Sequence, residues 1–134
     1  MTSLVEIEGI ADEYAAKLQG AGVDSVESLL SEGATPEGRA KIAADSEISE
    51  TRILKWVNHA DLFRINGVAG EYAELLEAAG VDTVVELAQR NAENLAEKLT
   101  EVNDAKHLVR RVPALSEVQS WVEEAKGLPR AVSY

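Results

Sequence analysis

Cysteine is absent from this chain of 134 residues, and aromatic residues make up only 4% of it. Without cysteine there can be no disulfide framework and no thiolate metal site. A chain of this length buries about two thirds of its unfolded surface, which is enough to fold without either cross-link. Its apolar content of 46% excludes an acidic disordered tail. Because alanine and leucine supply most of that content, the composition favours closely packed helices over sheets.

Long apolar runs are also missing. No stretch approaches the roughly 18 consecutive apolar residues that a membrane span requires. The N-terminal stretch "MTSLVEIEGIADEY" lacks the basic region and the apolar run that are typical of a signal peptide. We therefore expect a cytoplasmic protein that makes no membrane contact.

Basic residues are few, with 13 Lys and Arg against 24 Asp and Glu, for a formal net charge of −11. Such a balance favours solubility and repels polyanions. The charge is unevenly distributed, because residues 1–33 and 65–103 each carry −6, whereas residues 34–64 carry 0 and residues 104–134 carry +1. Any nucleic-acid contact would therefore come from the last two segments.

An internal repeat organises the chain. Residues 7–29 align with residues 65–87 without a gap, and 13 of the 23 aligned positions are identical. Self-similarity of this kind indicates a structural unit used twice. We predict a single domain, 1–134, made of the repeats 1–61 and 62–134, with hairpin units at 7–33 and 65–91. The two repeats are expected to be related by a pseudo-twofold axis and to share one core.

Helix signals recur in both copies. In the first, Tyr14, Leu18 and Ala21 fall on one helical face, and Gly22 suits a left-handed position at the helix end. Asp24 is predicted to cap the next helix. The second copy repeats these features, with Asp82 in the capping position.

Further helices are predicted outside the hairpin units. Thr35 followed by Pro36 indicates a helix start, Ser49 is expected to begin another helix, and Ser116 is expected to cap the last one. No alternating strand pattern is longer than "SLVEI", and the tail "GLPRAVSY" is expected to be extended or loose. The predicted fold class is all-α with eight or nine helices. Its predicted core includes Tyr14, Leu18, Val23, Leu29, Trp56, Tyr72, Leu76, Val81, Leu87 and Trp121.

Catalytic and metal-binding patterns are not found in the sequence. His59 and His107 are the only histidines, and both are expected at the surface or at its boundary. The stretch "DSEISE" at 45–50 has carboxylates but lacks the turn glycine and the spacing of a calcium loop. Acidic pairs at helix starts, such as Asp12 and Glu13, are better explained by the helix dipole than by acid–base catalysis. We expect no enzyme activity, no metal and no cofactor.

The starts of the two hairpin units are similar to the helix-hairpin-helix motif, in which glycines let backbone N–H groups approach a phosphate. The candidate hairpin residues are Gly9 and Ile10 in the first copy and Gly67 and Val68 in the second. In both copies the second glycine of the motif is replaced by alanine. Carboxylates follow at once, and they compete for the same N–H groups. The motif therefore indicates the fold more strongly than DNA binding.

Residues 38–57 have the rhythm of a helix-turn-helix, and a small basic cluster follows in "KHLVRRVP". Glutamates occupy the end of the second helix that would enter the groove. A helical hairpin that packs Trp56 into the core is therefore the favoured interpretation. If nucleic acid is bound at all, the candidate contacts are Arg39, Lys41, Arg52, Lys55, Arg110 and Arg111.

Together, the hairpin units, the junction "LKWVNHADLFRINGV" and the segment "LVRRVPALSEVQSWVEEAK" resemble domain of unknown function 4332 over nearly the whole chain. This resemblance implies a compact all-α fold related to helix-hairpin-helix domains, and no catalytic residues. The function we expect is a non-enzymatic module for protein–protein interaction or assembly, whose partner is another protein or a second copy. The alternative is DNA binding through the hairpins and the basic residues of 39–55 and 106–111.

Overall fold

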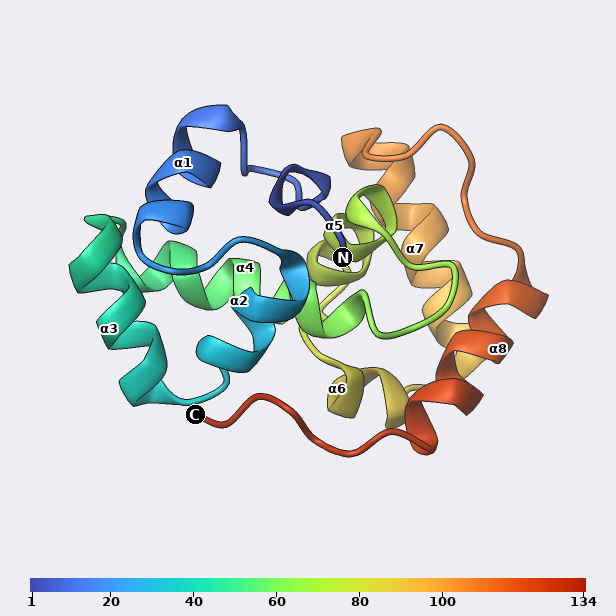
Figure 1. Ribbon diagram of the computed structural model, residues 1–134. Helices are drawn as coiled ribbons and strands as arrows, with labels where there is room; N and C mark the ends of the chain where they lie inside the picture. Colours follow the sequence, from blue (N-terminus) through green and yellow to red (C-terminus); the bar gives the residue numbers. More distant parts are fainter. The chain divides into compact units, whose positions relative to one another are not determined.

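Helices account for all the regular secondary structure in the computed structural model, which describes residues 1–134 (Figure 1). A short 3₁₀ helix, η1 (Leu4–Glu6), precedes eight α-helices. Their bounds are α1 Asp12–Gly20, α2 Val26–Glu32, α3 Pro36–Ser46, α4 Glu50–Leu62, α5 Gly70–Ala78, α6 Val84–Ala88, α7 Ala92–Lys106 and α8 Leu115–Lys126. The all-α prediction is confirmed. None of these helices combines the length and the apolar character needed to cross a membrane.

The chain divides into two compact units. Unit 1 comprises Met1–Asp61 together with Ala131–Tyr134, and unit 2 comprises Leu62–Arg130. The two sequence repeats meet at the same position, between residues 61 and 62. The pseudo-twofold axis and the shared core stay predictions.

Each unit encloses its own set of buried apolar side chains. Unit 1 buries Leu18, Leu29 and Ile53 completely, and unit 2 does the same with Leu76 and other leucines along α5, α6 and α7. Eight of the ten predicted core residues are buried. The two exceptions are the tyrosines Tyr14 and Tyr72, which are half-buried.

Several helix ends were predicted correctly, and others were not. Thr35 caps α3 by accepting a hydrogen bond from the Gly38 N–H, and Gly22 has a φ of 88° after α1. The cap of α2, however, is Ser25 rather than Asp24, because the Ser25 hydroxyl is the group that accepts from the Ser28 N–H. The cap positions of α6 and α8 are likewise shifted, to Thr83 instead of Asp82 and to Ala114 instead of Ser116.

The C-terminal tail was expected to be extended or loose; it lies outside the helices as expected, but it is not loose, because its last four residues are part of unit 1. The side chain of Val132 is buried, and the Ser133 N–H donates a hydrogen bond to the Ala34 carbonyl at 2.8 Å. In Figure 1 the C-terminus lies beside the loop that joins α2 to α3. The tail is therefore held by burial and by backbone hydrogen bonding.

Candidate functional site

The first hairpin (residues 7–11) joins η1 to α1 by a tight turn. The Ile10 N–H donates to the Ile7 carbonyl at 3.1 Å, and Gly9 has a φ of 96°. This is the third position of a four-residue turn, where a left-handed conformation favours glycine. A Cβ on Gly9 would lie 3.3 Å from the Trp56 indole nitrogen, so the hairpin backs directly onto that ring.

The second hairpin (residues 65–69) repeats this geometry before α5. The Val68 N–H donates to the Ile65 carbonyl at 3.1 Å, and Gly67 has a φ of 88°. A Cβ on Gly67 would lie 3.4 Å from the Trp121 indole nitrogen. Glycine is therefore required in both copies by the same turn and by the same close approach of a tryptophan.

The hairpin N–H groups are largely used within the protein. Those of Ile10 and Val68 close the turns, so a phosphate would have to displace these bonds. In the second hairpin the Asn66 N–H also donates to the Glu124 carboxylate at 3.0 Å. A chain carboxylate thus already binds an amide at a place where an anion would bind. Sequence reasoning did not identify Glu124.

The helix starts behind the hairpins keep a weak anion-binding character. Neither Ala11 nor Ala69, the cap residues of α1 and α5, supplies a side-chain cap. The first-turn N–H groups of these helices therefore lack a side-chain acceptor and carry the positive end of the helix dipole. Exposed carboxylates stand in the same first turns, at Asp12 and Glu13 in α1 and at Glu71 in α5.

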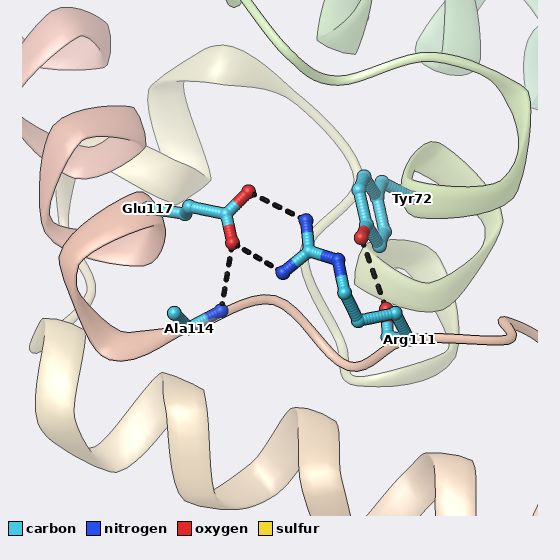
Figure 2. Close-up of polar contacts among 4 residues, drawn as sticks. All are labelled: Tyr72, Arg111, Ala114 and Glu117. Atoms are coloured by element: carbon cyan, nitrogen blue, oxygen red, sulfur yellow. Dashed lines mark hydrogen bonds and ion pairs between the residues drawn. The ribbon is translucent and has the colours of Figure 1, made fainter.

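Two of the six candidate nucleic-acid contacts, Arg39 and Arg111, each donate two hydrogen bonds within the chain. Arg39 is buried, and its guanidinium donates to the carbonyls of Gly33 and Ser133. Arg111 forms a two-pronged ion pair with Glu117, at 2.7 and 3.0 Å, as Figure 2 shows. Arg39 is therefore not accessible to a phosphate, whereas the exposed Arg111 guanidinium is already paired with a carboxylate.

The other four candidates are exposed, and they are divided between the units, with Lys41, Arg52 and Lys55 in unit 1 and Arg110 in unit 2. Lys41 pairs with Asp45 at 3.2 Å on α3, and Arg110 precedes the Arg111 ion pair in unit 2. Arg52 and Lys55 lie on the solvent side of α4. The Arg52 guanidinium lies 5.1 Å from the centre of the Tyr14 ring, and the Lys17 ammonium lies 6.0 Å from it. Two cations thus lie against the Tyr14 ring, which packs against Trp56.

The ion pair of Arg111 and Glu117 also orders the segment before α8. The Arg111 side chain is the main cause that holds the pKa of Glu117 down at about 2, and a hydrogen bond from the Ala114 N–H contributes. The same pairing raises the pKa of Arg111. The Tyr72 hydroxyl donates to the Arg111 carbonyl at 2.9 Å, so three elements of unit 2 meet here (Figure 2).

A groove of about 360 Å³ lies on unit 2, between α7 and the start of α8. Glu93 and Glu97 follow one another on one face of α7, and neither forms an ion pair within the chain. The large side chain of Leu115 is 42% exposed beside them. The groove therefore combines unneutralised negative charge with accessible apolar surface. It is lined by Glu93, Ala96, Glu97, Thr100, Pro113 and Leu115.

The two histidines have different environments. His107 is exposed at the end of α7, which confirms its predicted surface position, and its φ is 52°. His59 is completely buried on α4, so the prediction of a surface or boundary position was wrong. The buried face of α4 is not purely apolar, because it also includes the polar residues Asn58, His59 and Asp61. Across the whole chain, no group of three or more His, Asp or Glu side chains is placed to hold a metal ion.

Comparison with known proteins identifies a family. A family model described as "Domain of unknown function (DUF4332)" matches residues 8–128. The match spans most of the chain, from the first hairpin through α8, and the chain belongs to this family. No curated protein and no solved structure matches the chain.

Proposed function

We propose that this member of the DUF4332 family is a non-enzymatic tandem helix-hairpin-helix module that docks onto other proteins. The observation that carries the proposal is the hydrogen bond between the Asn66 N–H and the Glu124 carboxylate. It places a chain carboxylate on an N–H group of the second hairpin, which supports a scaffold role for that hairpin over phosphate binding. The exposed carboxylates at the starts of α1 and α5 support the same conclusion.

The groove on unit 2 is the docking surface we propose. Glu93 and Glu97 would pair with a Lys or Arg of the partner, whereas Leu115, Ala96 and Pro113 would contact an adjacent apolar side chain. Charge complementarity of this kind increases association rates and excludes acidic partners. The proposed partner is therefore a protein segment that combines basic and apolar residues.

Cross-linking from the groove tests this proposal. A photo-reactive amino acid at Thr100 should capture a partner, and one at the exposed Gln119 on α8 serves as the control position. Adding Glu93→Lys and Glu97→Lys should abolish the capture from Thr100, because both charges are reversed. Capture that is equal from Thr100 and Gln119, or that survives the charge reversal, would contradict docking in this groove.

Nucleic-acid binding is the second candidate, and one observation favours it. Arg52 and Lys17 flank Tyr14 next to the first hairpin, where α1 begins without a side-chain cap. A gel-shift titration with single- and double-stranded DNA and with RNA at low salt would test it. This candidate requires a complex that weakens steeply with salt and on Arg52→Gln. It is abandoned if no complex forms at up to roughly 100 μM protein, the weak end of non-specific binding.

A further inference from the structure

The segment Ala131–Tyr134 is bound to unit 1 as a short extended peptide would be. Val132 is only 2% exposed, so its side chain is buried within unit 1. The Ser133 N–H donates to the Ala34 carbonyl at 2.8 Å, and the Ser133 hydroxyl donates to the same oxygen at 3.2 Å. The segment is therefore held by side-chain burial at Val132 and by backbone hydrogen bonding at the next residue, Ser133.

Arg39 forms the centre of the surface that holds this segment. Its side chain is only 6% exposed, and one guanidinium nitrogen donates to the Ser133 carbonyl at 2.7 Å. A second nitrogen donates to the Gly33 carbonyl at 2.9 Å, which fixes the direction of the group. The guanidinium also lies 5.7 Å from the centre of the Tyr134 ring. A buried guanidinium needs such partners, because burial without them is unfavourable.

Asn58 completes the surface from α4. It is 7% exposed, and its side-chain oxygen accepts a hydrogen bond from the Tyr134 hydroxyl at 3.0 Å. Unit 1 thus contacts an apolar side chain at Val132, the backbone at Ser133 and an aromatic hydroxyl at Tyr134. Proteins recognise extended peptides in this way, with main-chain hydrogen bonds for affinity and pockets for alternate side chains.

We propose that this surface, defined by Ala34, Arg39 and Asn58, is a peptide-docking groove whose second occupant is the segment Ala131–Tyr134 of another copy of the chain. In the exchanged form the segment of each copy binds the groove of the other copy, and in the closed form it binds the groove of its own chain. The segment makes the same contacts in both forms, so the two forms differ only in the connection between the units. An intramolecular segment acts at an effective concentration on the order of millimolar, so the closed form prevails in dilute protein. This inference goes beyond the proposed docking function, because it concerns a different surface, on unit 1, and a different partner, a second copy of the chain. It is independent of the acidic groove on unit 2.

A full-length variant whose own segment cannot bind makes the groove accessible. Val132→Asp with Tyr134→Ala removes the apolar contact and the aromatic contact and leaves Ala34, Arg39 and Asn58 in place. The probe is a fluorescent peptide of residues 128–134, LPRAVSY, and the control peptide LPRADSA carries the same two changes. We expect saturable one-to-one binding of LPRAVSY to this variant. Binding to the unmodified protein should be at least about tenfold weaker, because its own segment competes.

Two further variants keep the test decisive. Tyr134→Ala alone changes a residue that is 63% exposed, so it serves if the double variant does not fold. Adding Arg39→Met to either variant should remove peptide binding.

Sedimentation velocity should show concentration-dependent dimers of the unmodified protein and none of the segment variant. A folded segment variant that binds LPRAVSY no better than LPRADSA would overturn the proposal. The cross-linking result at Thr100 would be unaffected, which distinguishes this failure from failure of the proposed function.

Discussion

In both units a tyrosine ring packs against a tryptophan ring next to a hairpin glycine. The ring centres of Tyr14 and Trp56 are 5.1 Å apart in unit 1, and those of Tyr72 and Trp121 are 5.4 Å apart in unit 2. The surroundings of the two pairs differ. Lys17 and Arg52 lie over the Tyr14 ring, whereas the Tyr72 hydroxyl is hydrogen-bonded to the backbone of the segment before α8.

The difference is clearest four residues before each tryptophan. That position holds Arg52 on α4 and Glu117 on α8, so the same place in the repeat carries opposite charges. Arg52 covers an aromatic ring, and Glu117 binds Arg111 and the Ala114 N–H. The comparison shows that the apolar cluster defines the unit, whereas the charges around it vary without changing the fold.

Truncation of the tryptophans should have the largest effect. Trp56→Ala and Trp121→Ala each remove a ring that is 3% exposed, and each should lower the free energy of unfolding by about 3–5 kcal/mol. Urea unfolding followed by circular dichroism measures both values. A near-neutral result for one tryptophan would show that its ring is used differently from its counterpart, and the equivalence of the two clusters would be lost.

Alanine at the hairpin glycines should have the next largest effect. Gly9→Ala and Gly67→Ala place a Cβ at φ values of 96° and 88° and crowd a tryptophan, so each should destabilise its unit by at least about 1–2 kcal/mol. Gly20→Ala is the control, because a Cβ there meets nothing within 4 Å and α1 gains a better helix former. Thermal unfolding in which all three variants behave alike would contradict the shared hairpin geometry.

A smaller, pH-dependent effect should follow substitution of Glu117 in unit 2. The folded pKa of Glu117 is about 2, below its ordinary value of 4.5, so folding favours the carboxylate. The resulting stability is fully present above pH 4.5 and is lost as the pH falls through about 2. Glu117→Gln should therefore lower the urea midpoint at about neutral pH, and the difference should shrink across this range. Glu123→Gln, which breaks a single contact to Lys126, is the control. An equal effect of this variant would contradict a specific contribution of Glu117 to the pH-dependent stability.

Removal of the tyrosine hydroxyls should have the smallest effect. Tyr72→Phe loses the hydrogen bond to the Arg111 carbonyl and should be destabilised by about 0.5–1 kcal/mol. Tyr14→Phe keeps the ring that Arg52 and Lys17 cover and should change stability by less than about 0.5 kcal/mol. Chemical denaturation of both variants gives the comparison. A larger loss for Tyr14→Phe would reverse the proposed difference between the units.

Much of the fold was predictable because its signals are local. The spacing of Tyr14, Leu18 and Ala21 defines a helical face within two turns, and Thr35–Pro36 marks a helix start through adjacent residues. The hairpin glycines were also identified from their neighbours. The cap positions of α2 and α6 were predicted one residue away, because adjacent polar residues compete for the same role, and that of α8 was predicted two residues away, because its cap position is an alanine.

The candidate site was less predictable, because charge in a sequence does not show whether a side chain reaches solvent. Arg39 and Arg111 were expected to be accessible cations, yet one is buried and the other is paired. The equivalence of Arg52 and Glu117 could have been found by extending the repeat alignment through the two tryptophans. The groove of unit 2 could not, because its walls come from α7 and from residues around the start of α8.

The sequence by itself determined that this chain is all-α, built from a repeated unit and a member of its family, because these properties depend on residues a few positions apart. Only the tertiary structure decided how the polar groups are used. The hydrogen bond from Asn66 to Glu124 spans 58 residues, and that from Arg39 to Ser133 spans 94. Contacts over such separations have no periodic signature in the chain, since they form only when packing of the apolar faces brings the elements together.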